Sequence, residues 1–484
     1  MLNRHFSIYL GAHLVPAVIG FFAITIYTRL LNPHEYGVYV VGMGVAGILG
    51  AVCFAWIRLS VARYQATSAD VDFRGTALLA FGLTVFAISS LAPAALLLFQ
   101  FDISIDVMIA SIFVAVAVGA FDISQEFQRA TLRPLRFAVI AVARSGLTLI
   151  FGVAAIRLGY GGFGLIMALG SGALICALMN MAGSGHGTPK WQGEQLKQFA
   201  RYGLPLSIGG LSNAIYTTSD RLIVAYLLGQ GATGLFGVAA DLPRQFMVML
   251  GSSVAAATVP ILFRTLAKDG RAATRERLNE NAELLLAVVC PVVVWLALAA
   301  DQVAGTFVGP EFRASVSLLL PVLALARLCG VINQFYVQIS FQLAERSLLL
   351  LFQACFTMLV SIAAMFPLIL YFGLFGAALA TLFAEAFGLV LAVYLARRAF
   401  PMPFDIRRLS GVLAAALAMA GAISLAKMSI TGTGFISLAA ISLIGGTVYA
   451  AAIWFFDVAR LRTLTIAALR RRRLLVPGFA GRKI

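Results

Sequence analysis

Four arginines lie within long apolar stretches of this 484-residue chain, at Arg144, Arg221, Arg244 and Arg327. An arginine at the centre of a membrane-spanning helix costs about 2.5–3.5 kcal/mol on insertion scales, so it needs water, an anion or an acidic partner. The planar guanidinium group also matches the geometry of a phosphate better than the point charge of lysine does. The embedded arginines therefore indicate a site for an anionic, phosphate-bearing ligand inside a membrane.

The elements that carry these arginines are helices in lipid. Apolar residues make up 61% of the chain and charged residues 12%, against roughly 25% charged in a soluble domain. The charge-free stretches predict an all-α polytopic membrane protein with about fourteen transmembrane helices. We expect these helices at 7–31, 36–57, 75–100, 105–127, 135–156, 162–181, 204–228, 234–263, 281–300, 314–343, 348–371, 375–396, 409–429 and 434–456.

One charge-free stretch, from Ser347 to Ala384, is too long for a single span. Its 38 residues would extend about 57 Å as one helix, whereas the hydrocarbon core is about 30 Å thick. We predict that the chain reverses at Tyr371–Phe372–Gly373, where glycine permits a turn.

An internal repeat divides the chain. Leu30 and Gly37 recur as Leu227 and Gly234, at an offset of 197 residues. The repeat predicts two six-helix lobes related by a pseudo-twofold axis along the membrane normal. The expected parts are an N-lobe at 1–182, a cytoplasmic linker at 183–203, a C-lobe at 204–397, two extra helices at 398–457 and a basic cytoplasmic tail at 458–484.

The basic residues lie mostly on one side of these helices. The chain has 36 Lys and Arg against 20 Asp and Glu, and 28 of the basic residues fall on the side of the N-terminus, against four on the other side. Because positively charged segments stay in the cytoplasm, both termini and the linker are expected there. This topology accounts for the basic excess, so no nucleic-acid partner is expected.

Acidic residues at matching depth offer partners for two of the arginines. The helices on either side of the second repeat form a hairpin in which Arg221 and Asp241 share one depth, as do Asp220 and Arg244. One interpretation is that Arg221 and Arg244 form structural ion pairs across the hairpin. In the alternative, Asp220, Asp241 and Glu385 are candidates for binding a coupling ion.

The other two arginines, Arg144 and Arg327, have no evident partner in their own hairpins. Arg327 begins a polar stripe that continues through Gln334, Gln338 and Gln342 at helical spacing. Such a stripe faces water or a polar ligand and not lipid. We therefore predict that Arg144, Arg327, Gln334 and Gln338 bind the substrate, with a salt bridge from Arg327 to Glu385 as the alternative. A comparable polar face near the inner end of the helix at 105–127 holds Asp122, Gln125, Glu126 and Arg129.

The chain contains no P-loop, H-E-x-x-H or G-x-S-x-G motif, and its four histidines are scattered. Its five cysteines have no C-x-x-C spacing, which argues against ligation or disulfides. We expect no catalysis, metal or cofactor.

The first hairpin has the sequence Tyr27-Thr28-Arg29-Leu30-Leu31-Asn32-Pro33-His34-Glu35-Tyr36-Gly37-Val38-Tyr39. It closely resembles the first hairpin of bacterial polysaccharide flippases, the O-antigen and exopolysaccharide translocases. Four further stretches resemble the same family: Gln128-Arg129-Ala130, Tyr202–Pro205, Ser219–Ile223 and Gly234–Phe236. The resemblance carries over Arg29 and Asp220–Arg221 individually. It implies membership of the multidrug/oligosaccharidyl-lipid/polysaccharide exporter superfamily and a V-shaped pair of six-helix bundles.

The resemblance also implies a function. A polyprenyl-diphosphate-linked oligosaccharide would move from the inner to the outer leaflet of the bacterial inner membrane, for lipopolysaccharide or exopolysaccharide biosynthesis. Its diphosphate would bind Arg29, Arg144 and Arg327. The expected partners are this substrate, membrane lipids and a polysaccharide polymerase complex. The alternatives are a lipid II flippase, a cation-coupled small-molecule exporter and a non-transporting scaffold of a glycan-assembly complex.

Cysteine accessibility tests the expected topology. In a variant without native cysteines, a Cys at Gly185 should resist a membrane-impermeant maleimide on intact cells, whereas a Cys at Ala232 should react, because only the second lies outside. Labelling at Gly185 but not at Ala232 would overturn the orientation.

Overall fold

The computed structural model of the chain describes residues 2–67, 72–98, 104–182, 193–430, 432–458 and 462. The regular elements among these residues are all helices. Close contacts between residues divide the chain into two compact units, each built from separate stretches. Unit 1 comprises Met1–Gln245, Phe307–Leu319 and Leu351–Ala384, and unit 2 comprises Phe246–Thr306, Leu320–Leu350 and Glu385–Ile484.

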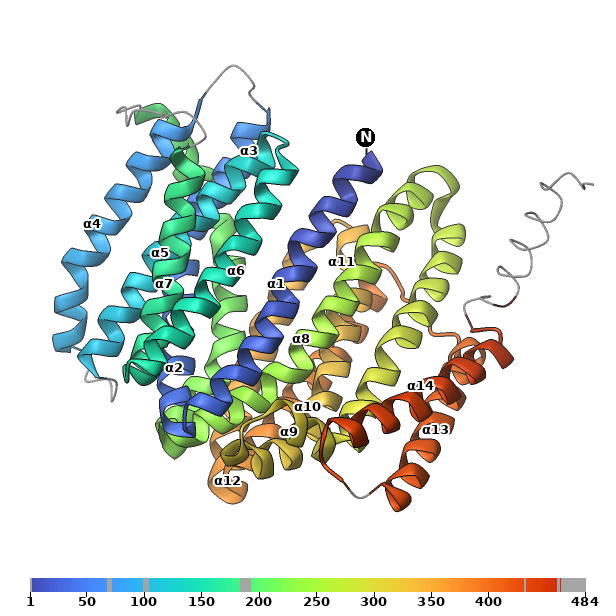
Figure 1. Cartoon of the computed structure of the whole chain (residues 1–484). Coiled ribbons are helices and arrows are strands. Elements are labelled where there is room, and N and C mark those ends of the chain that lie inside the picture. The colour runs from blue at the N-terminus through green and yellow to red at the C-terminus, as the bar shows by residue number, and fades with distance from the viewer. Residues whose placement is uncertain are drawn as a thin grey trace, which may run out of the picture. The chain divides into compact units, whose positions relative to one another are not determined.

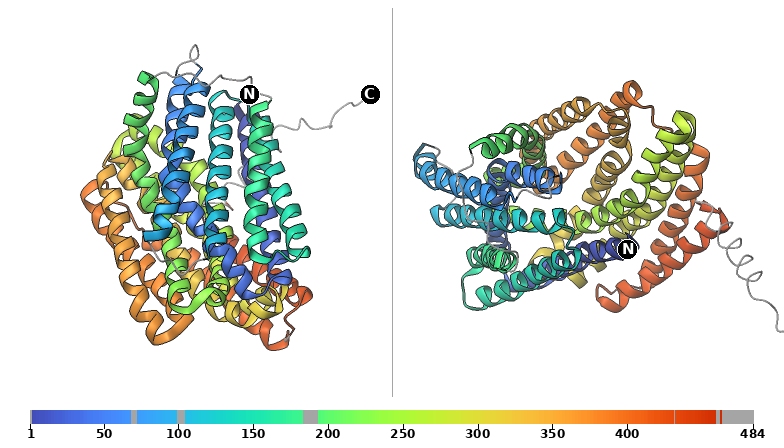
Figure 2. Two further views of the ribbon diagram at one scale, coloured as in Figure 1. Left: turned by 90° about the vertical axis from the view of Figure 1, so that its left-hand side faces the viewer. Right: turned by 90° about the horizontal axis from the view of Figure 1, so that it is seen from above.

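Unit 1 begins with the helices α1 to α7 (Figures 1 and 2). The helix α7 packs against both α5 and α6, and α6 also packs against α1. The turn into α2 is specified locally, because the Asn32 side chain accepts a hydrogen bond from the Glu35 backbone N–H and Pro33 occupies the first helical position. The helices are α1 (Leu2–Leu30), α2 (Pro33–Cys53), α3 (Ala55–Thr67), α4 (Arg74–Leu98), α5 (Ile105–Ala130), α6 (Pro134–Arg157), α7 (Gly161–Ala182) and the first part of α8 (Gly193–Leu298).

The long element α8 reverses direction twice. Gly229 and Gly270 have φ values of +82° and +79°, a backbone conformation that glycine adopts without strain. Arg221 and Asp241 form a salt bridge across the first reversal, and the rings of Phe246 and Trp295 lie 6.1 Å apart across the second. A continuous helix would separate each of these pairs by tens of ångströms. Figure 1 shows the second reversal as a yellow-green hairpin.

The element α12 (Ser347–Ala399) also contains a reversal. Gly373 has φ +58° and ψ −136°, and a methyl group on Gly376 would collide with the carbonyl group of Leu368. The turn expected at Tyr371–Phe372–Gly373 is therefore present.

Unit 2 contains the remainder of α8 and the last helices of the chain. The indole N–H of Trp295 donates to Ser442 Oγ at 2.9 Å, and the Tyr449 hydroxyl donates to the Ala287 carbonyl at 2.8 Å, which fixes α14 against α8. The other elements of unit 2 are most of α9 (Ala300–Phe307), the later part of α10 (Arg313–Ile332), the π-helical turn η2 (Asn333–Val337), α11 (Ile339–Leu343), α13 (Ile406–Ser429) and α14 (Phe435–Phe455). The short helix η1 (Pro310–Phe312) and the start of α10 belong to unit 1.

The described helices have the length and composition of membrane spans. Nine of them are long and apolar enough to cross a membrane, and Leu14–Leu30 and Arg74–Ser90 are shorter apolar stretches. Counting the three segments of α8 and the two of α12 separately gives fourteen apolar segments among the described residues. The expected all-α multi-pass membrane fold is confirmed.

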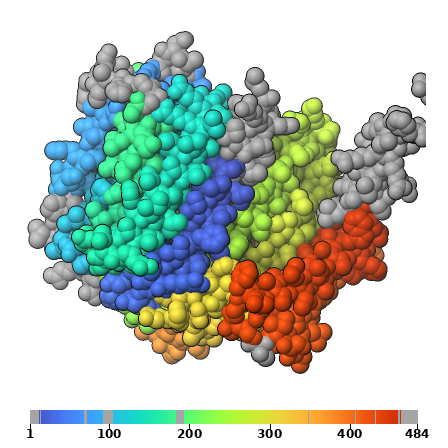
Figure 3. Space-filling view, viewed as in Figure 1, coloured from blue at the N-terminus to red at the C-terminus, as the bar shows by residue number. Residues whose placement is uncertain are grey.

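The surface of α13 and α14, red in Figure 3, carries exposed apolar side chains. Lipid can cover such side chains without loss of free energy. They include Leu413, Leu417, Leu425, Phe435, Ile436 and Leu443.

The two repeat glycines contact each other's hairpins. A methyl group on Gly37 would collide with the Gln230 carbonyl, and one on Gly234 would collide with the Pro33 carbonyl. The offset of 197 residues relates Gly37 to Gly234 and Pro33 to Gln230, so the same close approach occurs twice in reciprocal form. The repeat in the sequence therefore corresponds to two equivalent backbone contacts within unit 1. Both positions require glycine, because any side chain would collide with the opposite backbone.

Two element boundaries differ from the expectation. The helix expected at 36–57 ends at Cys53, and α3 begins after Phe54. The helix expected at 314–343 is interrupted by the π turn at Asn333–Val337. The linker at 183–203 is described only from residue 193, and of the tail at 458–484 only residues 458 and 462 are described. The division into N-lobe and C-lobe stays a prediction, since the two units combine the chain differently.

Candidate ligand cavity in the first unit

A cavity of about 580 Å³ lies within unit 1. One face of α1 lines its length, from Ala12 through Pro16, Ile19 and Ala23 to Tyr27, and these sixteen residues of helix span about 22 Å. The remaining walls come from α2, α3, α5, α6 and α7. The cavity is therefore elongated along α1.

Charged side chains gather in one part of this cavity. They are Arg58 of α3, Asp122, Glu126 and Arg129 of α5, and Arg144 of α6. Three guanidinium groups against two carboxylates leave a net charge of +1. This sign favours an anionic ligand over a cationic one.

Local packing brings α3 and α5 together. The ring of Phe54, between α2 and α3, is buried against Gly119, where a methyl group would collide with it. The Ser60 hydroxyl donates to the Phe199 carbonyl at 2.9 Å and anchors α3 on α8. As a result, Arg58 Nη1 lies 3.6 Å from Asp122 Oδ2.

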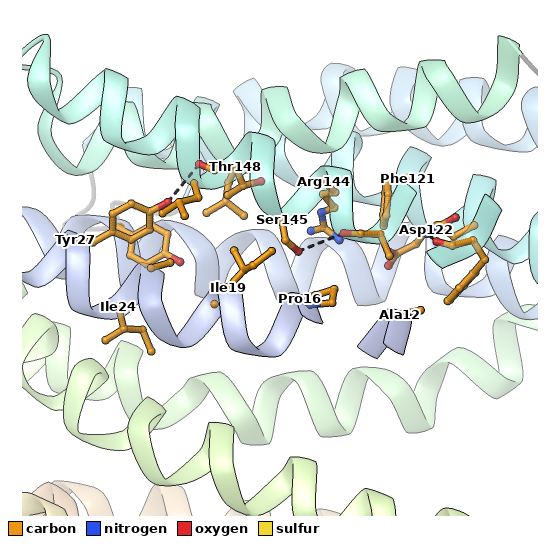
Figure 4. A pocket seen from close by; sticks show the side chains of 18 of the residues that line it. Ala12, Pro16, Ile19, Ile24, Tyr27, Phe121, Asp122, Arg144, Ser145 and Thr148 are labelled. Atoms are coloured by element: carbon orange, nitrogen blue, oxygen red, sulfur yellow. Dashed lines mark hydrogen bonds between the residues drawn. The ribbon is translucent and has the colours of Figure 1, made fainter. Parts of the chain in front are cut away.

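Arg144 is held by an aromatic ring. Its guanidinium carbon lies 4.5 Å from the centre of the Phe121 ring, a cation–π contact. Asp122 lies within electrostatic range of both Arg144 and Arg58. In Figure 4 the side chain of Arg144 lies beside Phe121, with Asp122 next to that ring. The three charged groups Arg58, Asp122 and Arg144 are called the arginine cluster below.

Neighbouring polar residues are bound locally. Glu126 pairs with Arg129 one turn later at 2.7 Å. Gln125 donates to the Phe137 carbonyl at 3.1 Å and accepts from the Asn180 amide at 3.2 Å. The arginine cluster differs from these locally bound residues, because its three charged groups come from three different helices, α3, α5 and α6.

Tyrosines occupy the other end of the cavity. Tyr27, Tyr36 and Tyr39 contribute to its wall. The Tyr27 hydroxyl donates to the Thr148 carbonyl at 3.3 Å (Figure 4). Aromatic rings with a polar tip give this end an amphipathic lining.

The expectation that Arg144 has no partner in its own hairpin is wrong. Phe121 and Asp122 lie eleven and ten residues before Leu132, where φ is +53°, and Arg144 lies twelve residues after it. The three residues thus share one depth in the α5–α6 hairpin. Sequence reasoning also missed Arg58, which it counted only among the residues that set the topology.

The second cluster of embedded charges is an ion-pair network. Arg221 and Arg244 both contact Oδ1 of Asp241, the latter at 2.9 Å. The hairpin spacing predicts that Arg244 pairs with Asp220. Arg244 contacts Asp241 instead, because it lies only three residues after Asp241 on the same helix. Asp220 Oδ1 accepts a hydrogen bond from the Arg221 backbone N–H at 2.8 Å. A coupling ion at Asp241 would compete with two guanidinium groups.

The partner of Arg327 lies outside its own hairpin, on α12. Arg327 Nη1 lies 3.2 Å from Oε1 of Glu385, whose side chain is 5% exposed. This is the salt bridge that stood as the alternative. The π turn holds more residues per turn than an α-helix, so the α-helical spacing from Gln334 to Gln338 is not kept. Gln334 is exposed and Gln338 is half-buried.

Arg29 is exposed at the end of α1 and does not line the described cavity. Its backbone lies against Gly309, where a methyl group would meet the Arg29 nitrogen. Its place as a substrate contact stays a prediction.

The helical spans define a multi-pass membrane fold with a charged cavity in unit 1. Residues 26–317 match the family described as "Polysaccharide biosynthesis protein". The chain belongs to this polysaccharide biosynthesis family. No curated protein matches it.

Solved structures of transporters share the fold. "Lipid II flippase MurJ, inward closed conformation" aligns with a TM-score of 0.74 and 16% identity over 92% of this chain and 98% of the other. An inward-facing multidrug resistance MATE family transporter of the MOP superfamily aligns at 0.63 and 16% over 80% and 97%. An outward-facing MATE family transporter aligns at 0.54 and 17% over 82% and 94%. The family match confirms the polysaccharide family that the first hairpin resembles, and the solved structures show that the fold is shared.

Removing Arg327 should destabilise the protein by leaving a carboxylate unpaired. Breaking a buried pair from one side costs about 3–5 kcal/mol, so Arg327→Ala should lower the yield and the Tm of the detergent-solubilised protein. Adding Glu385→Gln should restore much of the Tm, because no charge is then left without its partner. An Arg327→Ala protein with unchanged Tm would show that this salt bridge is not structural.

Proposed function

We propose that the protein is a flippase for a polyprenyl-diphosphate-linked oligosaccharide, which it moves from the inner to the outer leaflet for surface or extracellular polysaccharide biosynthesis. The observation that carries this proposal is the arginine cluster inside an elongated membrane cavity. Membership of the polysaccharide biosynthesis family supports the substrate class. Alternating access of the cavity to the two sides would perform the translocation.

The cavity suggests where each part of the substrate binds. The diphosphate pairs with Arg144 and Arg58, whose guanidinium forks match phosphate oxygens. The sugars extend along α1 toward Tyr27 and Tyr39, where aromatic faces and hydroxyl groups line the wall. The polyprenyl chain, which is as apolar as the membrane, stays in lipid.

Arg327 has a different place in this proposal. Because it pairs with Glu385, it contributes to stability and can contact the diphosphate only if that salt bridge opens. Gln334 and Gln338 stay candidate contacts for sugar hydroxyl groups, and Asp220, Asp241 and Glu385 stay candidates for ion coupling. The arginine cluster carries the proposal without them.

A lipid II flippase is the second candidate. The alignment with the lipid II flippase MurJ covers 92% of this chain, against 80% and 82% for the two MATE transporters. Both candidate substrates contain a polyprenyl diphosphate, so the arginine cluster suits either. A cation exporter fits poorly, because the cavity carries a net positive charge. A non-transporting scaffold would not need a charged cavity.

For the cellular setting, we propose the bacterial inner membrane with both termini in the cytoplasm. The multi-pass helices support a membrane location, and the distribution of basic residues supports the orientation. A polysaccharide polymerase complex is the partner we propose for the exported glycan.

Replacement of Arg144 tests the function directly. In a strain lacking this protein, Arg144→Ala should restore export at least about tenfold less well than the wild type, since hydrogen bonds to charged groups contribute about 1.5–3 kcal/mol. Arg144→Lys should restore it partly. Arg157→Ala is the matched control, because Arg157 is exposed at the end of the same helix and does not line the cavity.

Mass spectrometry of the lipid-linked glycans that accumulate in the strain separates the two substrates. If the protein is a flippase for lipid-linked oligosaccharides, these lipids should accumulate. If it is a lipid II flippase, lipid II should accumulate instead. Normal export by a stably expressed Arg144→Ala protein would contradict diphosphate binding at this cavity and favour the scaffold.

A further inference from the structure

We infer that Asp122 is an internal competing anion, which neutralises Arg58 and Arg144 while the cavity is empty and is displaced when a lipid diphosphate binds. This inference rests on the proposed function and adds a residue that sets how tightly the substrate is held. Asp122 is then a specificity and positioning residue, because it acts through the two arginines.

The position of Asp122 carries this inference. Its Oδ2 lies 3.6 Å from Arg58 Nη1, and its charge also acts on Arg144. It precedes the wall residue Gln125 by one helical turn and follows Phe121, whose ring holds Arg144. The carboxylate therefore lies where an anion attracted by both arginines would bind.

The pair between Asp122 and Arg58 is loose. At 3.6 Å it is longer than the 2.7 Å between Glu126 and Arg129 in the same cavity wall. The side chains of Arg58 and Asp122 are 46% and 37% exposed, and ion pairs with this exposure contribute little. A ligand with two phosphate groups can therefore replace Asp122 at a small cost.

Charge balance gives the displacement a consequence for transport. The arginine cluster has a charge of +1 with Asp122 ionised and +2 without it. A diphosphate diester carries two negative charges, so Asp122 repels it at close range. Such an internal competitor keeps the bound lipid from being held too tightly to leave on the other side. An Asn at this position would remove the repulsion and leave the shape nearly unchanged.

Binding of farnesyl diphosphate to the purified full-length protein in detergent tests the inference. By isothermal titration calorimetry, Asp122→Asn and Asp122→Ala should each bind the diphosphate about tenfold more tightly than the wild type, because both remove the repulsion between the Asp122 carboxylate and the diphosphate. Agreement between the two variants excludes a new hydrogen bond from the amide. A Tm measurement on each variant verifies folding, and Asp122→Ser replaces either one that does not fold.

Two controls make the result specific. Glu126→Gln removes an equal charge from the same wall, but Glu126 is bound to Arg129 within its own helix. The affinity of this variant for the diphosphate should therefore differ from that of the wild type by less than about threefold. With Arg144→Gln and Arg58→Gln together, adding Asp122→Asn should no longer tighten binding, because without these arginines the diphosphate is not held beside Asp122.

Each outcome has a distinct meaning. Unchanged or weaker binding by both Asp122 variants overturns the inference, as does an equal gain from Glu126→Gln, which would indicate a general effect of charge. If Arg144→Gln weakens binding while the Asp122 variants do not strengthen it, the inference fails and the proposed function stands. If the wild type and Arg144→Gln bind the diphosphate equally, the proposed function fails at this cavity and the inference fails with it.

Discussion

The cost of placing a guanidinium group among membrane helices governs the arrangement of this protein. Arg221 and Arg244 share Asp241, and Arg327 contacts Glu385, so each of these three contacts a carboxylate. Arg144 is stabilised by the ring of Phe121, with Asp122 only within electrostatic range. A cation held by a ring keeps much of its capacity to bind an anion. The least neutralised arginine therefore lies in the cavity that a ligand can enter.

Close backbone contacts give the cavity a firm end in unit 1. Gly37 approaches Gln230 and Gly234 approaches Pro33 in the same way, so two hairpins from different parts of the chain meet without side chains between them. Tyr36 lies next to this contact and is buried while lining the cavity. The repeat in the sequence thus reflects a physical requirement for glycine at both positions.

The sequence predicted the features that depend on local spacing. Charge-free stretches identified the helices, stretch length required the turn at Gly373, and equal distances from a turn placed Arg221 opposite Asp241. The same reasoning would have paired Arg144 with Asp122 across Leu132. Arg327 and Glu385 are 58 residues apart in different helices, so spacing alone could not select this pair over others. The π turn after Arg327 likewise has no signature in the apolar pattern, and it breaks the spacing of the glutamine stripe.

The proposed function requires that the diphosphate of a lipid-linked substrate binds the arginine cluster of unit 1. A cryo-electron microscopy map of the protein in nanodiscs with a polyprenyl diphosphate is the most direct measurement of this claim. We predict diphosphate density within hydrogen-bonding distance of Arg144 and Arg58, with the Asp122 carboxylate turned away from both. Density for the diphosphate elsewhere on the protein, with this cavity empty and Asp122 still beside Arg58, would contradict it.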